Sequence, residues 1–460
     1  MKKTPFLALL VTLVMSVAFA GCDDSTDTDY EISRDCLVSA VTLGKLNRTL
    51  HTTSSTGEDS TYTVSVTGSL YPVYIDQLKN LIYNADSLPV GTDVTKVVFS
   101  TFNATGRGTL KSMTTGQDTI FTSTDSTDFS RPRVLTVYSV DEKWRREYTI
   151  DIRVHAEEAD SFVWQKIADS PSNAVAAFTE SRALCADHML YVFGKLNDGR
   201  VQLLQTAADA PDFSRAGTVT VAEGTLDVRS VQLFKGTFFA VAGDRLVKAV
   251  AADATQWTAV AAAPTFNTLA GVSSDSLYAV AAGRMYASAD GEHWVESAVD
   301  TENKLPESSI TSAVQASRTD ESFENVVMVG RKDGAVSVWK RDIDRKGDYS
   351  YPWMYLPQTE ELGEYACPAL NQATLIGYDD AVVLAGVNDM HEVGPFYVSR
   401  DYGRTWKTGE MKHPDMQQTT ALAVTVDENH YLWMFCGGTG RVYKGRINRL
   451  GWNNEQTRFE

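Results

Sequence analysis

The chain has 460 residues, of which 43% are hydrophobic and 22% are charged, and its formal net charge is −17 at pH 7. This length is too great for one ordinary domain, and the composition is typical of globular rather than disordered protein. An acidic surface excludes DNA and RNA as expected partners, because phosphate binding requires clustered lysine and arginine. We interpret the negative charge as a source of solubility and expect a monomer.

The first 22 residues predict export and a lipid anchor. Lys2 and Lys3 precede the apolar stretch Phe6–Ala20, which is too short and wrongly flanked for a membrane-spanning helix. The run FAGC that ends at Cys22 resembles a bacterial lipobox, with Phe19 where leucine is usual. This resemblance implies cleavage before Cys22, lipidation of its thiol and anchoring in a lipid membrane. The alternative is a buried or free Cys22.

Residues 23–31, with the sequence DDSTDTDYE, are acidic and polar. Such a segment cannot bury a core, so we expect a flexible tether. An acidic segment directly after a lipidated cysteine also resembles the surface-export signal of Bacteroidetes lipoproteins. This resemblance implies a location at the outer membrane or cell surface.

The remaining cysteines lie far apart and show no C-x-x-C spacing; they are Cys36, Cys185, Cys367 and Cys436. We expect buried free thiols, and a disulfide is the alternative. The seven histidines form neither H-x-H nor H-E-x-x-H. The sequence therefore predicts no metal site, and nothing in it implies a cofactor.

Residues 32–155 are rich in threonine and serine and alternate apolar with polar residues. Thr61–Leu70 is one expected strand, and Arg133–His155 is expected to form a strand, a charged turn and a second strand. Ile75–Tyr83 admits a short helix. We predict an immunoglobulin-like β-sandwich for this region.

The end of this region, in which Tyr148, Ile150 and Ile152 are expected to face one way, looks like the last strand of adhesive Ig-like modules. Such modules are common in bacterial surface proteins. The resemblance implies a domain that spaces or docks its neighbour.

A repeat begins at Ala159. Ser399–Trp406 reads S-x-D-x-G-x-T-W, which resembles the Asp-box of sialidases and other β-propellers. Similar pairs of an aspartate and an aromatic recur at intervals of 37 to 59 residues, close to the length of a four-stranded propeller blade. The pairs are Asp160 with Trp164, Asp209 with Phe213, Asp253 with Trp257, Asp290 with Trp294, Asp348 with Trp353, and Asp401 with Trp406.

Six boxes predict a six-bladed β-propeller over residues 159–460, so the whole chain is expected to be all-β. The first box precedes every complete blade, and the last unit lacks a good box near Trp452. We therefore expect the strand that holds Trp164 to supply the outer strand of the last blade and close the ring. The alternative places the Trp452 segment there and assigns Trp164 to the linker.

The boxes are expected to be structural. The aspartate accepts backbone N–H bonds in a tight turn between the third and fourth strands, the glycine adopts positive φ, and the aromatic packs between blades. The resemblance places these turns on the face opposite the usual propeller ligand site. A catalytic role for a box aspartate is therefore not expected.

Four arginines recur at the start of the third strand of their units: Arg200, Arg245, Arg284 and Arg441. Arg331 lies near the equivalent place in the fourth unit. If they ring one face, their forked guanidinium groups suit a carboxylate or sulfate on a glycan or peptide. The alternative is that each arginine pairs with a local carboxylate and stabilises its own turn.

The longest loops on the same expected face contain Glu307, Glu361, Glu364 and Tyr365. Two carboxylates and an aromatic can serve a glycosidase, whereas glutamate is also common in solvated loops. A sialidase is expected to show an R-I-P motif in the first propeller strands, and this region contains only Arg182. Sialidase activity is therefore not predicted.

The lipobox, the run IYNADSLPVGTD and the boxes together resemble a group of Bacteroidetes lipoproteins with an Ig-like domain followed by an Asp-box propeller. Our first hypothesis is a non-catalytic surface lipoprotein that binds or scaffolds a glycan or protein, with Tyr365 and the four arginines as ligand-binding candidates. The second is an extracellular glycoside hydrolase or lyase that uses Glu307, Glu361 and Glu364.

Overall fold

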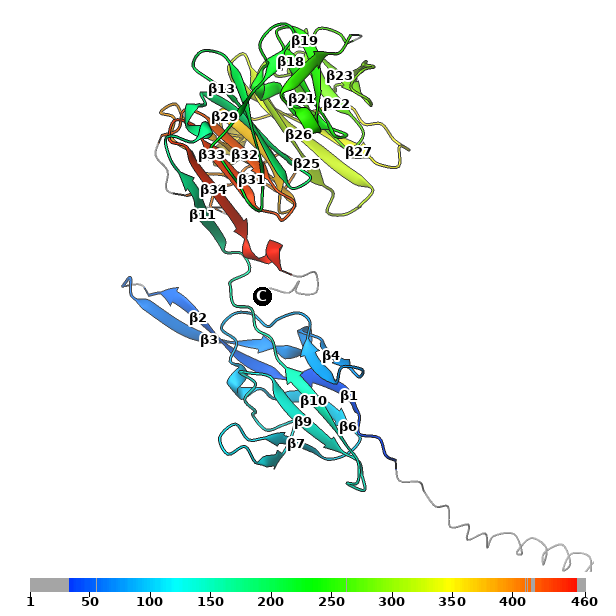
Figure 1. Cartoon of the computed structure of the whole chain (residues 1–460). Coiled ribbons are helices and arrows are strands. Elements are labelled where there is room, and N and C mark those ends of the chain that lie inside the picture. The colour runs from blue at the N-terminus through cyan, green and yellow to red at the C-terminus, as the bar shows by residue number, and fades with distance from the viewer. Residues whose placement is uncertain are drawn as a thin grey trace, which may run out of the picture. The chain divides into compact units, whose positions relative to one another are not determined.

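The computed structural model describes residues 33–452, apart from residues 55, 262, 410, 412 and 415–417. Cys22 and the acidic segment 23–31 lie outside the described residues. The chain divides into two compact units that meet between Ala156 and Glu157. Both units consist of strands joined by turns and short 3-10 helices (Figure 1). In the described part of the chain, no helix has the length and apolar character needed to cross a membrane.

The first unit contains a six-stranded sheet in the order β4-β5-β10-β9-β7-β8 and two separate pairs, β1-β6 and β2-β3. Its strands are β1 (Val38–Leu43), β2 (Lys45–Thr53), β3 (Asp59–Thr67), β4 (Val73–Asp76), β5 (Leu81–Asn84), β6 (Phe99–Ala104), β7 (Gly108–Lys111), β8 (Asp118–Ile120), β9 (Arg133–Tyr138) and β10 (Arg145–Asp151). The hairpin expected in Arg133–His155 is present as antiparallel β9 and β10. On its other edge β10 pairs with β5 in parallel.

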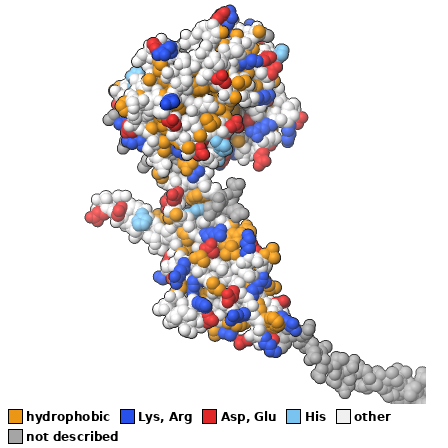
Figure 2. Space-filling model, in the orientation of Figure 1, with side chains coloured by type: hydrophobic (Ala, Val, Ile, Leu, Met, Phe, Trp, Pro, Cys, Tyr) orange, Lys and Arg blue, Asp and Glu red, His pale blue; other side chains and the backbone are white. Residues whose placement is uncertain are grey.

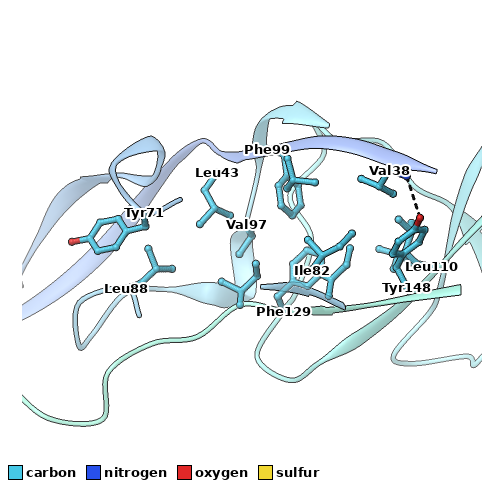
Figure 3. Close-up of a cluster of buried hydrophobic side chains, with 14 of the residues drawn as sticks. Val38, Leu43, Tyr71, Ile82, Leu88, Val97, Phe99, Leu110, Phe129 and Tyr148 are labelled. Atoms are coloured by element: carbon cyan, nitrogen blue, oxygen red, sulfur yellow. Dashed lines mark hydrogen bonds between the residues drawn. The ribbon is translucent and has the colours of Figure 1, made fainter. Parts of the chain in front are cut away.

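Every second side chain at the end of β10 points into the core of the first unit. Tyr148 and Ile150 are fully buried, and Ile152 is nearly so, as their period of two predicted. Figure 3 shows Tyr148 among the core side chains next to Val38, whose backbone N–H donates to the tyrosine hydroxyl at 3.4 Å. This contact ties the first strand of the unit to the last.

The expected helix over Ile75–Tyr83 is wrong, because this segment is the β4-β5 hairpin. The Asp76 carboxylate accepts the backbone N–H groups of Leu78 and Lys79, at 3.0 and 2.9 Å. Asn80 then adopts a φ of 54°, which reverses the chain. An aspartate that bonds its own following backbone favours a turn over a helix.

The second unit is a β-propeller (Figure 1), and its described residues form six sheets; five consist of consecutive strands and the last combines β32–β34 with β11. The first three sheets contain β12 (Glu180–Ala186), β13 (Met189–Lys195), β14 (Val201–Ala207) and β15 (Gly217–Thr218); β16 (Thr220–Val221), β17 (Gln232–Phe234), β18 (Thr237–Ala242), β19 (Arg245–Val250) and β20 (Gln256–Ala259); and β21 (Thr268–Val272), β22 (Leu277–Ala281), β23 (Arg284–Ser288) and β24 (Val295–Ser297). The other three contain β25 (Ser308–Ala316), β26 (Phe323–Lys332), β27 (Ala335–Asp344) and β28 (Met354–Leu356); β29 (Asn371–Tyr378), β30 (Ala381–Val387) and β31 (Tyr397–Ser399); and β32 (Leu422–Val426), β33 (Leu432–Cys436), β34 (Arg441–Ile447) and β11 (Phe162–Asp169).

The last sheet joins the two ends of the propeller. β11, which contains Trp164, pairs antiparallel with β34 from Phe162 opposite Ile447 to Asp169 opposite Arg441 (Figure 1). This is the position that the sequence analysis assigned to the Trp164 strand. Trp452 instead follows the 3-10 helix η7 (Asn448–Gly451). The pairing covers the edge that β34 would otherwise expose.

A charged cluster holds this junction on the side where β11 begins. Arg449 in η7 forms ion pairs with Asp379, at 2.6 Å, and with Asp160, at 2.7 Å. Arg400 also pairs with Asp379, at 3.0 Å. Burial acts to raise the pKa of Asp379, but hydrogen bonds from the two arginines hold it below its usual value. The cluster therefore links the turn after β29 to both ends of the propeller.

We expect Asp379→Asn to lower the free energy of unfolding by about 1–3 kcal/mol at pH 7, because two arginines lose a buried charged acceptor. A carboxylate with a depressed folded-state pKa stabilises the fold above its unfolded pKa and loses this effect as pH falls through the folded pKa. The difference from the natural protein should therefore shrink below about pH 4. Urea unfolding at several pH values measures it, with exposed Asp380→Asn as the control. A difference independent of pH would contradict the role of the charge.

The four cysteines in the described residues are free thiols. Cys36, Cys367 and Cys436 are buried and Cys185 is half-buried. Burial raises the pKa of Cys185 and of Cys436 to about 12. The expectation of buried free thiols therefore holds for three of the four, and no disulfide links the strands of either unit in this part of the chain.

Candidate functional site

The turn after β31 has the hydrogen bonds expected of a structural aspartate. Asp401 accepts from the backbone N–H of Thr405, at 2.9 Å, and from its hydroxyl, at 2.6 Å. Ser399 donates to the same carboxylate and accepts from the backbone N–H of Gly403. The Trp406 indole N–H donates to the Gly403 carbonyl at 3.1 Å. The carboxylate is occupied by its own turn.

Two further turns follow this pattern in part. Asp290 accepts from the backbone N–H groups of Glu292 and His293, each at 2.8 Å. These backbone bonds, first that of His293, hold the pKa of Asp290 far below its usual value. Asp253 accepts from the hydroxyl of Thr255 at 2.6 Å.

The other three predicted box aspartates do not hold a turn of this kind. Asp160 lies just before β11, which pairs with β34 from the other end of the propeller, so no tight turn joins these two strands. The Asp160 carboxylate pairs with Arg449 instead. Asp344, rather than Asp348, accepts the backbone N–H groups of the fourth turn. Asp209 is exposed, while the hydroxyl of Thr206 accepts from the backbone of its turn.

The box aromatics differ in burial. Trp353 and Trp406 are fully buried, and Phe213 and Trp257 are nearly so. Trp164 and Trp294 are half-buried. All six are in or beside the outer strands of their sheets, where they contact side chains rather than an open site.

The four repeated arginines lie at the predicted strand ends, and each has a carboxylate partner. The pairs are Arg200 with Asp198 at 2.7 Å, Arg245 with Glu223 at 2.9 Å, Arg284 with Glu296 at 2.7 Å, and Arg441 with Asp169 at 3.1 Å. Arg331 donates to the Leu370 carbonyl at 3.2 Å. Each of the four is therefore paired with a carboxylate, as the alternative interpretation expected, but only Arg200 has its partner in its own turn. The partner of Arg441 is Asp169 in β11, far away in the chain. Figure 2 likewise shows basic and acidic side chains mixed across the visible face of the propeller.

The loop carboxylates are not brought together as one set. Glu361 and Glu364 are exposed on the 3-10 helix η6 (Glu360–Tyr365). Tyr365 is 44% exposed, and the Lys407 ammonium group lies 5.8 Å from its ring centroid. Glu307 lies elsewhere, beside Lys332, with which it forms an ion pair.

The inner strands of the six sheets form a ring. β12 contacts β32, and contacts then run through β29, β25 and β21 to β17. The 3-10 helix η4 (Val228–Ser230), just before β17, contacts β12 and completes the circle. A hollow of about 350 Å³ lies where these strands begin, lined by Glu180, Asp227, Arg229, Asn267, Thr268, Glu307, Ser308, Ser309, Ile310, Gln372 and Ala373.

Three consecutive inner strands are irregular around this central hollow. The pairing register shifts between Leu269 and Gly271 in β21, between Ser308 and Thr311 in β25, and between Asn371 and Thr374 in β29. The remaining inner strands β12, β17 and β32 pair without a shift. Bulges of this kind re-aim side chains and are frequent next to functional sites.

Two residues at the hollow also adopt left-handed backbone conformations. Ser309 has a φ of 53° and Gln372 has a φ of 49°. Residues without glycine's freedom adopt this region at an energetic cost and occur there disproportionately at ligand sites. The Gln372 side chain uses its position to pair with β32, donating to the Thr420 carbonyl and accepting from the Leu422 N–H, both at 2.7 Å.

Arg229 spans the hollow from the second sheet. Its guanidinium donates to the Ser181 carbonyl of β12, at 3.0 Å, and to the Ala373 carbonyl of β29. Its own backbone N–H donates to the Asp227 carboxylate at 2.9 Å. Three sheets therefore meet at one half-buried side chain that lines the hollow.

Two charged side chains that line the hollow, Asp227 and Arg229, are largely desolvated. Burial raises the pKa of Asp227, and burial lowers the pKa of Arg229. Asp227 and Glu180 act on Arg229 as nearby negative charges, although neither lies within ion-pair distance. Groups perturbed in this way inside a concave site mark a candidate binding site.

Of the charged residues that line the hollow, only Glu307 was predicted from the sequence as a candidate site residue; Glu180, Asp227 and Arg229 were not. All three are charged residues at or just before the first strand of their units. This position alone does not identify a site, because the sequence does not show that the first strands meet in a ring. Among the described residues, no three or more histidine, cysteine, aspartate or glutamate side chains form a group suited to bind a metal ion.

Comparison with known families decides the classification. Residues 158–455 match the DUF6242 beta propeller domain, and residues 41–152 match the DUF6242 N-terminal domain, a domain of unknown function. The chain belongs to the DUF6242 family. The match to the propeller domain begins before β11 and ends after β34, the two strands that close the ring. β11 is therefore part of the DUF6242 propeller. No curated protein matches the chain.

Several solved structures resemble this DUF6242 protein at low identity. A structural genomics protein of unknown function from Bacteroides thetaiotaomicron is 13% identical, with a TM-score of 0.41, over 82% of this chain and 98% of that one. The SapL1 lectin in complex with alpha methyl fucoside is 12% identical, with a TM-score of 0.37, over 57% and 90%. A Trichoderma reesei carbohydrate-active enzyme of family AA12 is 8% identical, with a TM-score of 0.39, over 64% and 97%. We draw no functional conclusion from these likenesses.

Proposed function

We propose that this chain is a non-catalytic binding protein whose central hollow receives the end of a glycan. The observation that supports this most is the hollow itself, which sits at the centre of the ring and is lined by irregular strands and perturbed charges. Its volume of about 350 Å³ lies in the range of small-ligand sites.

The lining groups favour a ligand rich in hydroxyl groups. Ser308 and Ser309 are exposed and offer hydroxyls that donate and accept, and Glu180 and Asp227 offer carboxylate acceptors. The Asn267 side-chain oxygen accepts from Ala282, which leaves its amide N–H groups for a ligand. Sugar hydroxyls match such a mixture of donors and acceptors.

The carboxylates favour binding over hydrolysis. Asp227 accepts a backbone N–H of its own turn, Glu307 pairs with Lys332, and Glu180 pairs with Lys195 at 3.5 Å. A glycosidase instead needs one carboxylic acid and one free carboxylate held on opposite sides of the scissile bond. We therefore rank hydrolase or lyase activity second.

The architecture extends this proposal. We interpret the six sheets as six blades, with Asp-box turns at Asp253, Asp290 and Asp401, and the first unit, with its core at β1, β5, β9 and β10, as an Ig-like stalk. Lipidation of Cys22, followed by the acidic tether, would anchor the protein at the outer membrane or cell surface. Labelling with a radioactive fatty acid, abolished by Cys22→Ala, tests the anchor.

A glycan array probed with the purified protein tests the proposed function, followed by calorimetry with the glycans that bind. Glu180→Gln and Asp227→Asn should each weaken binding about tenfold or more, because each removes a charged hydrogen-bond acceptor. Arg200→Gln and Glu361→Gln, outside the hollow, serve as controls and should leave the affinity unchanged.

Two results would count against this function. Unchanged affinity in both hollow variants would place the ligand elsewhere. Turnover of a polysaccharide, abolished by Glu307→Gln, would establish the hydrolase or lyase in its place.

A further inference from the structure

Arg182 in β12 is a buried cation, and none of the described residues is a hydrogen-bond or ion-pair partner of its side chain. Its side chain belongs to a residue that is only 6% exposed, and its Nε atom is buried with no hydrogen-bond partner. No described carboxylate forms an ion pair with it. An arginine has five N–H donors and remains charged, so burial in this state is costly.

The side chains of β12 alternate between its two faces, and this alternation shows which residues surround Arg182. Leu184, two residues later, packs with Val228 and Val231 of the second sheet, so the same side of β12 presents Arg182 toward that sheet. The charged groups on this side are Glu180, two residues earlier in β12, and Arg229, whose guanidinium donates to the carbonyl of Ser181. Burial, and then the charge of Arg229, lower the pKa of Arg182 to about 10.

Two like charges therefore lie near each other in the interior, and neither forms an ion pair with a residue that the structure describes. The acidic residues that act on Arg229 are Glu180 and Asp227, and only the positive charge of Arg229 acts on Arg182. A second buried atom without a partner, the hydroxyl of Thr374, follows Ala373, whose carbonyl also bonds Arg229. Hydrogen-bonding capacity thus remains unused on both strands that Arg229 joins.

We propose that β12 contains a buried site for a small monovalent anion such as chloride, bound by the guanidinium of Arg182 between the first two sheets. A negative ion there satisfies the free donors and offsets the repulsion between the two arginines. Arg182 does not line the central hollow, so the glycan proposed there is not expected to supply this charge. A monatomic ion requires little space and suits an interior site.

The test is thermal unfolding of the purified protein in sodium bromide, with ionic strength held constant by sodium isethionate, whose bulky anion is too large for an interior site. We expect the Tm to rise by about 2 °C when bromide exceeds its dissociation constant tenfold. Arg182→Met should remove this dependence and should be at least as stable as the natural protein without bromide, since it removes an uncompensated buried charge.

Arg200→Met is the matched control, because Arg200 already pairs with Asp198 at the surface, and it should keep the bromide dependence. Anomalous diffraction from bromide-soaked crystals adds a readout that needs no variant. A peak within about 3.5 Å of the Arg182 guanidinium is expected from hydrogen-bond geometry. A bromide-independent Tm in the natural protein, or water alone at that position, would overturn the proposal.

Discussion

A protein that begins at Glu157 should fold into a stable propeller, whereas one that begins at Ser172 should not. The second lacks β11, which pairs with β34 over its whole length and places Trp164 6.1 Å from Phe396, measured between ring centroids. Its loss leaves β34 as a long open edge, and such edges pair with other chains. We expect the shorter protein to aggregate or to show a non-cooperative thermal transition.

Size-exclusion chromatography and circular dichroism compare the two proteins. Adding a peptide of residues 157–171 to the shorter protein should restore a monomer with a cooperative transition, since it supplies the missing strand. A monomeric shorter protein with an unchanged Tm would show that the ring does not depend on this strand.

Trp406→Ala should lower the free energy of unfolding by about 3–5 kcal/mol, as expected for a large buried aromatic. Trp294→Ala should cost less, about 1–2 kcal/mol, because the half-buried Trp294 loses less contact with the interior. Both indoles donate to a glycine carbonyl in the turn before them, at 3.1 and 3.2 Å. Because both tryptophans make the same hydrogen bond and differ in burial, comparing the two variants separates the contribution of burial to stability from that of the hydrogen bond.

Urea unfolding of the two variants measures this difference. Equal losses would mean that the indole hydrogen bond, rather than packing, is the main contribution of these aromatics. Loss of glycan binding in Trp406→Ala without loss of stability would contradict a structural role altogether.

Local patterns predicted the parts of the fold that depend on neighbouring residues. The hairpin of β9 and β10 follows from alternation, and the turn at Asp401 follows from side chains that bond their own backbone. The strand of Trp164 was placed by counting repeats, since one sheet had no outer strand of its own. Each of these inferences needs only residues close in sequence or a repeat.

The helix expected over Ile75–Tyr83 and the box expected at Asp348 were wrong for local reasons, because Asp76 and Asp344 bond the backbone of their own turns. The other errors and omissions arise where distant segments decide the outcome. Asp160 resembles a box aspartate, but the ring closure places it beside Arg449. The central hollow was missed for the same reason, because Glu180, Asp227 and Arg229 become neighbours only when the inner strands meet. The repeated arginines stood out in the sequence by their period, and their partners include Asp169, far away in the chain.

The closing strand has a mechanical consequence. The chain enters β11 at Phe162 and reaches Asp169 at the edge where β32 begins, because Asp169, Arg441, Cys436 and Leu422 are paired in a row. The central hollow lies at that edge. If the hollow binds a ligand and Cys22 is anchored, as we propose, tension between the two runs along β11 and shears its ladder, so that the hydrogen bonds to β34 resist together rather than opening one after another.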